Sequence, residues 1–186
     1  MRILIAGLLG AIAMFVWSTI AHVATPLSYA GISKMQNEPT VLSAMQTGVG
    51  TKSGLYFFPW VAPTDPKAME KEAVLMKTNP TGILIYHPPG TSTDMTQLLI
   101  EEFAKELAQC LIAAFLLSLT MIAGYLRRVG FVALVGVFGV LGADTSYMIW
   151  YGFPCSYTLA AMTIEIVGAI AAGLAIAWWM GRRATA

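Results

Sequence analysis

The sequence has 186 residues, of which 57% are hydrophobic and only 11% are charged, and its net charge is +1. A typical soluble domain carries about 25% charged residues. This composition therefore excludes an ordinary soluble protein and indicates that lipid surrounds part of the chain. The near-zero charge excludes the basic surface that nucleic-acid-binding proteins use. The sequence has no glycine-rich phosphate loop and no G-x-S-x-G or H-E-x-x-H motif, so we expect no nucleotide site and no enzyme.

Four long apolar runs predict four transmembrane helices, because about 20 apolar residues cross about 30 Å of hydrocarbon. They occupy residues 1–23, 107–126, 129–150 and 157–180. The first run is longer than the apolar part of a signal peptide, roughly 7–15 residues, so we expect a retained span. Asp144, Thr145 and Ser146 interrupt the third run, which makes it the least regular of the four.

The arginines predict the orientation of these spans. They are Arg2, Arg127, Arg128, Arg182 and Arg183. Every one lies at an end that faces the cytoplasm if the chain starts inside and crosses four times, as the positive-inside rule requires. We therefore expect a bacterial inner-membrane protein with both termini in the cytoplasm, a cytoplasmic tail at 181–186 and residues 24–100 in the periplasm.

The periplasmic segment is predicted to fold as a small α/β domain. Helices are expected after Asn37 and from Asp65-Pro66, and strands at 54–60 and 82–89, because turn and capping residues bound each stretch. The two helix–strand units resemble each other, either as a repeat or because both use good caps and strand breakers. The strand–helix–strand order favours a parallel pair.

Asp94, with Gln97 three residues later, predicts a capping box that starts a further helix. No breaker follows, so we expect one continuous helix from Asp94 to Leu126, with the stalk and second span at 101–126. The predicted fold is thus an all-α membrane four-helix bundle, with the α/β domain between the first and second spans.

Two carboxylates, Asp144 and Glu165, lie at similar predicted depth on consecutive spans, and no Lys or Arg is expected at that level. Ionisable residues inside a bilayer are costly and often functional. They could form a proton or cation site, or anchor a polar headgroup. They could instead be protonated and hydrogen-bonded to polar neighbours as contacts between helices, or Asp144 could lie in water at the mouth. The candidate hydrogen-bond partners are Tyr147, Ser146 and Thr163.

The aromatic, histidine and cysteine residues suggest contacts on the outer side. Candidate interface residues are His22, Trp17, His87 and Trp60. The two histidines could share a haem or metal only if they met, and without further ligands at the usual spacing they make a poor site. We therefore predict no metal site, and the sequence does not indicate a cofactor. Cys110 and Cys155 both lie toward the outer side and could form a disulfide.

Small residues in the third and fourth spans predict tight helix packing. They are Gly136, Gly139, Gly142, Gly168 and Ala172. Such residues let two backbones approach closely, either as a hairpin of the two spans or as an external face for a partner subunit or pigment.

The stretches WSTIAHVATPLSYAGI, QNEPTVLSAMQ, GLYFFPW and GILIYHPPG carry a resemblance. They resemble small bacterial four-span membrane proteins in which the first span ends in a Trp…His…Pro-Leu pattern and an outer Tyr-Phe-Phe-Pro stretch follows. The resemblance covers the first half of the chain best and implies no activity.

These features together predict a non-catalytic accessory or assembly subunit of a larger inner-membrane complex, respiratory or photosynthetic, with lipid and other membrane subunits as partners. The alternatives are a proton- or cation-linked transporter that uses the intramembrane carboxylates, and a quinone- or haem-binding redox protein.

Overall fold

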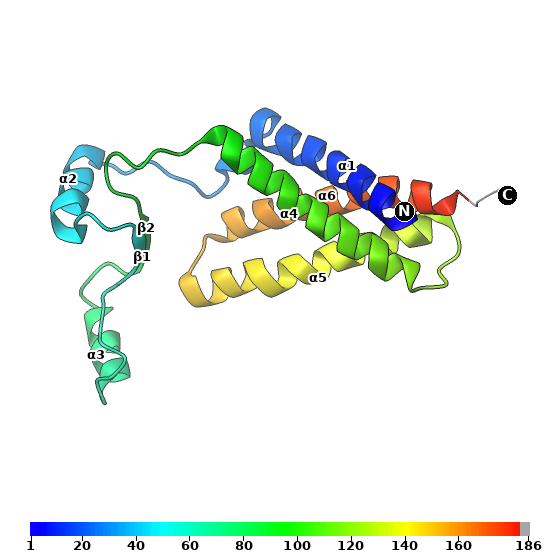
Figure 1. The fold of residues 1–186 in the computed structure, drawn as a ribbon. Helices are drawn as coiled ribbons and strands as arrows, with labels where there is room; N and C mark the ends of the chain where they lie inside the picture. Colours follow the sequence, from blue (N-terminus) through cyan, green and yellow to red (C-terminus); the bar gives the residue numbers. More distant parts are fainter. Residues whose placement is uncertain (183–186) are drawn as a thin grey trace. The chain divides into compact units, whose positions relative to one another are not determined.

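The computed structural model describes residues 1–182, which form two compact units (Figure 1). A helical unit comprises residues 1–32 and 94–182, and a small α/β unit comprises Ser33–Thr93. The α/β unit is narrower than the predicted 24–100, because the segment after the first helix packs back onto the helical unit. In that segment Gly31 has φ +76° and lies so close to Tyr157 that a side chain would clash.

The helical unit is built from four long helices and one short one. They are α1 (Arg2–Ala24), the 3-10 turn η1 (Pro26–Tyr29), α4 (Met95–Ser118), α5 (Tyr125–Tyr151) and α6 (Cys155–Gly181). Three of them, α1, α5 and α6, are long and apolar enough to cross a membrane. The chain is therefore a multi-pass membrane protein, mostly helical, as its composition predicts.

The four long helices form an open row rather than a closed square. Helix α1 packs between α4 and α6, and α6 packs between α1 and α5, whereas α4 and α5 barely touch. The core where α1 meets its neighbours consists mainly of small side chains around Ile176, which is fully buried. Such residues let helices approach closely, which replaces the hydrophobic drive that lipid removes.

The sequence predicted one continuous helix from Asp94 to Leu126, and this prediction is wrong. Helix α4 ends at Ser118, and residues 119–124 form a connection before α5. The Thr120 hydroxyl donates to the carbonyl of Leu117, and Gly124, with φ +90°, precedes α5. The apolar sequence continues through this turn, so hydropathy alone could not locate it.

Helix α5 begins at Tyr125, four residues earlier than predicted, and therefore contains Arg127 and Arg128 in its first turn. It also continues through Asp144–Ser146 to Tyr151 without a break. The Ser146 hydroxyl donates to the carbonyl of Gly142 within the same helix, so this polar stretch finds partners without leaving helical geometry.

Helix α4 differs from the other three long helices because charged residues occupy its first half. Its apolar part, residues 107–118, would extend only about 18 Å, less than the roughly 30 Å of a hydrocarbon core. The charged residues before it are Glu101, Glu102, Lys105 and Glu106.

The α/β unit contains α2 (Glu38–Val49), β1 (Gly54–Phe58), α3 (Ala68–Leu75) and β2 (Gly82–Tyr86). The two strands pair antiparallel, with Leu55 opposite Ile85 and Phe57 opposite Ile83. The predicted parallel pair is therefore wrong. Helix α3 is short and has no buried residue, so it does not act as a crossover helix that packs on the sheet.

Of the predicted helix caps, some are confirmed and others are wrong. The Asp94 side chain accepts from the backbone N–H of Thr96, as expected, but Gln97 bonds Glu101 instead of closing the capping box. Asn37 precedes α2 without a side-chain capping bond. Asp65 accepts from the N–H of Lys67 in a turn just before α3, which begins two residues after the expected start at Pro66.

Candidate functional site

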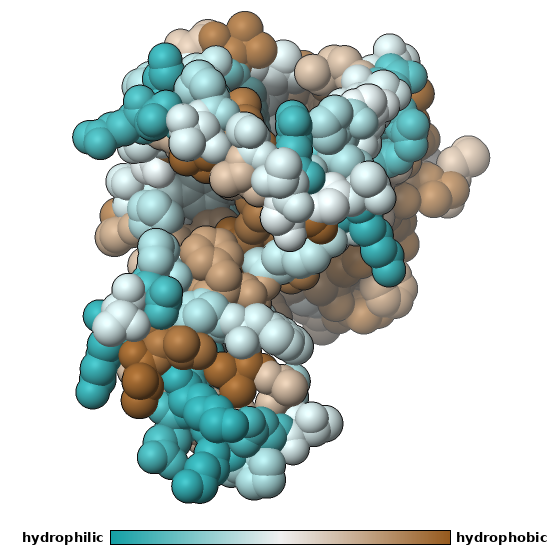
Figure 2. Space-filling model, turned by 90° about the vertical axis from the view of Figure 1, so that its left-hand side faces the viewer, coloured by the Kyte–Doolittle hydropathy of each residue, from teal (hydrophilic) through white to brown (hydrophobic). Residues whose placement is uncertain are grey.

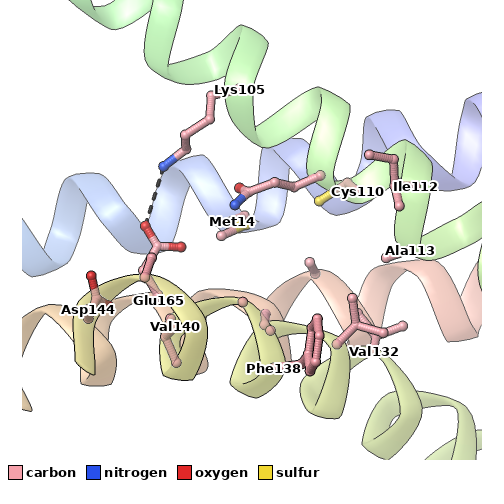
Figure 3. Close-up of a pocket in the computed structure, with 17 residues that line it drawn as sticks. Met14, Lys105, Cys110, Ile112, Ala113, Val132, Phe138, Val140, Asp144 and Glu165 are labelled. Carbon is pink, nitrogen blue, oxygen red and sulfur yellow. Dashed lines mark hydrogen bonds and ion pairs between the residues drawn. The ribbon is translucent and has the colours of Figure 1, made fainter. Parts of the chain in front are cut away.

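The weak contact between α4 and α5 leaves a groove between them, with a cavity volume of about 450 Å³. Helices α4 and α5 form its walls, and residues of α1 and α6 form its floor (Figure 3). Most of the groove is lined by apolar side chains such as Ile112, Val132 and Phe138, whereas one end is lined by charged residues. We call this feature the α4–α5 groove.

The charged end brings together residues from three helices. The ammonium of Lys105 on α4 lies 3.3 Å from a carboxylate oxygen of Glu165 on α6 and 2.8 Å from one of Glu102. Asp144 on α5 lies beside Glu165, close enough for the two charges to interact (Figure 3). The expectation that no lysine or arginine lies at this level is therefore wrong. Lys105 supplies the missing cation from a turn of α4 that was assigned to an external stalk.

Asp144 is the unsatisfied member of this cluster. Among the described residues it has neither an ion-pair nor a hydrogen-bond partner. The proposed polar partners do not reach it: the hydroxyls of Ser146 and Thr163 donate to carbonyls of their own helices. Tyr147 packs on the rings of Tyr151 and Phe153 and does not line the groove. The predicted hydrogen bonds from Asp144 to these polar residues, which would have joined α5 to α6, are therefore not formed.

Glu106 is a buried acid that the sequence interpretation missed. Its side chain is 1% exposed, and its Oε2 atom has no hydrogen-bond partner among the described residues. The Ser18 hydroxyl of α1 lies beside the same carboxylate. The signal was its place one residue before an apolar run, on the face of α4 that Cys110 continues one turn later.

The opposite end of the helical unit carries arginines. Arg2 donates to the carbonyls of Met180 and Arg182 at 2.9 and 2.8 Å, which ties the start of α1 to the end of α6. The Arg182 guanidinium lies 3.9 Å above the ring centre of Trp178. About 24 Å of helix separates Asp144 from Arg128, so the acidic cluster and the arginines occupy opposite ends. Arg183 and the predicted tail at 181–186, apart from Gly181 and Arg182, lie outside the described residues.

The predicted interface residues fall into two groups. Trp17 is internal: its Nε1–H donates to the carbonyl of Ile164 at 2.9 Å, joining α1 to α6. His22 is exposed at the end of α1, with Nδ1 2.8 Å from the carbonyl of Ser18. His87 and Trp60 are exposed on the α/β unit.

The structure does not join the two cysteines. Both are free: Cys110 is buried in the helical core, and Cys155 is exposed at the start of α6.

The small residues predicted for tight packing on α5 and α6 do not share one helix interface. Gly136 contacts Ala169 on α6, Gly168 contacts Met14 and Trp17 on α1, and Ala172 is buried in the core. A Cβ added at Gly139 or Gly142 would meet no other part of the protein within 4 Å, and of these two positions Gly139 lines the α4–α5 groove. The tightest approach is the predicted one at Gly136, where a Cβ would lie 2.4 Å from that of Ala169, but the close approaches at Gly7 and Gly10 on α1 were missed. A Cβ at Gly10 would meet the Ile176 side chain at 2.8 Å.

Comparison with protein-family models, with curated proteins and with solved structures finds no match to this chain.

Proposed function

We propose that this protein is a four-span inner-membrane protein that acts as a non-catalytic accessory or assembly subunit of a larger complex. Its termini would face the cytoplasm and Ser33–Thr93 the periplasm. Successive long helices run in alternate directions, and Arg2, Arg128 and Arg182 lie at one end of them, which the positive-inside rule assigns to the cytoplasm. Helix α4 would cross the membrane in addition to α1, α5 and α6. Its charged turns would pack against α1 and line the charged end of the α4–α5 groove.

The observation that carries the accessory role is that the α/β unit has almost no interior. All of its residues are described, and only Tyr86 is buried. Its helices α2 and α3 bury no residue at all. A two-stranded sheet is marginal by itself in water, so this unit needs something else to cover it.

One face of the sheet shows where cover is missing. Leu55, Phe57, Ile83 and Ile85 share that face through the strand register, and Leu55 and Ile85, which lie opposite each other, are 70% and 68% exposed. Figure 2 likewise shows hydrophobic residues on the surface beside the most hydrophilic part of the α/β unit. Contiguous exposed apolar patches of this kind mark interaction sites.

A protein partner fits this face better than the bilayer surface does. Segments that bind membrane surfaces carry an excess of Lys and Arg, whereas this unit has five lysines and four acids, a net charge of only +1. Both strands also have an unpaired edge, because the sheet has two strands only. A neighbouring subunit can supply both a strand for such an edge and a hydrophobic surface for the face.

Gentle solubilisation of native membranes, followed by affinity purification and sizing, tests this role. We expect the wild-type chain to bring down a defined membrane subunit in fixed ratio. The double variant Leu55→Ser/Ile85→Ser should lose that subunit while still inserting in the membrane. The matched control is Met69→Ser on α3, which replaces a side chain that is 86% exposed in the same unit and should retain the partner. A monodisperse wild-type monomer without a companion contradicts the proposal.

A second candidate, a proton- or cation-linked transporter, rests on the meeting of Lys105, Asp144 and Glu165 in the α4–α5 groove. Ionisable groups in a membrane often lie on ion pathways. The purified chain in vesicles should then dissipate an imposed proton or sodium gradient. Loss of that flux in Asp144→Asn and Glu165→Gln would support transport, and equal flux in empty vesicles would exclude it.

A further inference from the structure

The α4–α5 groove has the build of a site for an amphipathic molecule. Charged groups lie at one end only, and the remaining walls are apolar. Its volume of about 450 Å³ falls within the roughly 300–1,000 Å³ of small-molecule sites. Phe138 and Ile112 line it and are largely exposed, so a long chain can enter sideways from the bilayer.

The groups at the charged end of the groove define what the polar part of the ligand must carry. Lys105 faces Glu102 and Glu165, while Asp144 has no partner among the described residues. Of the two carboxylates that line the groove, Glu165 pairs with Lys105 and Asp144 has no cation among the described residues, so a bound group gains most by bringing a positive hydrogen-bond donor to Asp144.

The same end also offers donors for an anion. A lysine ammonium has three N–H donors, of which two are directed to Glu102 and Glu165. The amide of Gln109 also lines the groove. A group that combines an ammonium with a phosphate thus matches both requirements, whereas a neutral quinol leaves the charge of Asp144 uncompensated.

We infer that the α4–α5 groove binds a phospholipid with a primary-amine headgroup, phosphatidylethanolamine in type. The ammonium contacts Asp144, the phosphate lies toward Lys105 and Gln109, and one acyl chain follows the apolar wall past Val132 and Phe138. The depth agrees, because about 24 Å of helix between Asp144 and Arg128 places the headgroup near the edge of a hydrocarbon core about 30 Å thick. This inference needs α5 and α6 in the bilayer but not the accessory role.

Native mass spectrometry of the full chain in a non-ionic detergent tests the inference. Dioleoyl phosphatidylethanolamine, phosphatidylcholine and phosphatidylglycerol are titrated separately, so that the acyl chains are constant. We expect one tight site for the ethanolamine lipid, with phosphatidylglycerol at least about tenfold weaker, because a hydrogen bond to a charged group is worth that factor or more. Equal affinity for all three lipids overturns the inference.

Two kinds of variant test the headgroup contact and the acyl-chain contact separately. Asp144→Asn should remove the preference for the ethanolamine lipid, and its melting temperature shows that the fold persists. Gly139→Leu places a side chain in the groove, whereas Gly142→Leu makes the same change at another open position that does not line it. Binding should fall at least about tenfold in the first and stay unchanged in the second.

Two results contradict the proposal directly. If Gly139→Leu and Gly142→Leu behave alike, the lipid does not occupy the groove. If decylubiquinol displaces the lipid and binds Asp144→Asn as tightly as wild type, the groove is a site for a neutral quinol.

Discussion

The two units of this protein differ in where their apolar residues lie: the helical unit buries a set of them in a core, and the α/β unit leaves almost all of them unburied. In the helical unit, glycine and alanine on α1 let α4 and α6 approach until Ile176 is fully buried. In the α/β unit, the larger side chains of Leu55 and Ile85 lie exposed on a two-stranded sheet. The first unit therefore specifies its packing from within. The second has secondary structure without a core, so its stability must depend on what covers it.

The largest expected effect is a difference in hydrogen exchange between the units in purified chain. Amides of β1 and β2 should exchange more than about a hundredfold faster than buried amides of α1 and α6, because opening the sheet exposes little new apolar surface. Mass-resolved exchange measures this. Protection of the strands equal to that of α1 would show that the α/β unit needs no partner. In native membranes the strands should become protected, and the Leu55→Ser/Ile85→Ser variant should remain unprotected.

Gly10→Leu should break the helical unit. Even a Cβ at Gly10 would lie 2.8 Å from Ile176 and 3.3 Å from the Sγ atom of Cys110, and Ile176 is fully buried. Overpacking of this kind costs about 1–3 kcal/mol or more. Thermal unfolding in detergent, followed by circular dichroism, gives the size of the loss.

The matched control for Gly10→Leu is Gly142→Leu on α5, where an added Cβ would meet no neighbouring helix within 4 Å. Its unfolding temperature should equal that of the wild type or rise slightly, since leucine favours helix over glycine. Equal destabilisation of both variants would mean that Gly10 does not hold α1 closely against α6.

The charged end of the α4–α5 groove should give a smaller, asymmetric effect. Lys105→Met leaves Glu102 and Glu165 without their cation, whereas Glu165→Gln relieves repulsion with Asp144. We therefore expect Lys105→Met to destabilise more than Glu165→Gln does. The double-mutant cycle should give a coupling free energy of about 1 kcal/mol, the scale of polar contacts between membrane helices. Equal single-variant losses, or no coupling, would show that the pair does not form.

Sequence rules located the elements that depend on local chemistry. The bounds of α1 and α6 lie within one or two residues of their apolar runs, and Asp94 caps α4 through its own side chain. Each of these depends on residues a few positions apart, which the sequence displays directly. The end of α4 was missed because Leu119 and Met121 are apolar yet lie in a turn.

What the sequence could not show is how far each helix is displaced along its axis. Asp144 and Glu165 could be placed at one depth by counting along their own helices, but the ion pair of Lys105 with Glu165 depends on how α4 and α6 lie along each other, which no local pattern shows. The antiparallel strand pair was missed for a related reason. The strands and their connection were recognised, but the direction of pairing depends on packing that α3, with no buried residue, does not provide.

The smallest effect concerns the turn before α3 in the α/β unit. The Lys71 ammonium, and then the backbone N–H of Lys67, hold the pKa of Asp65 below its usual value of 3.8. A carboxyl with a lowered folded-state pKa stabilises the fold above its unfolded pKa, and this contribution is lost as the pH falls through the lower, folded value. The turn should therefore loosen below about pH 4.

Hydrogen exchange of residues 65–75 at pH 5 and pH 3, corrected for the intrinsic rates, measures that loosening. Asp65→Asn should exchange at the wild-type acid rate at both pH values, since it lacks the charge that Lys71 contacts. Glu70→Gln is the matched control, because it removes an acid of the same unit that makes no ion pair among the described residues and should keep the wild-type pH dependence. If Asp65→Asn still loosens on acidification, the turn is held by other groups. The exposed α/β unit would then owe its weak order to the sheet alone.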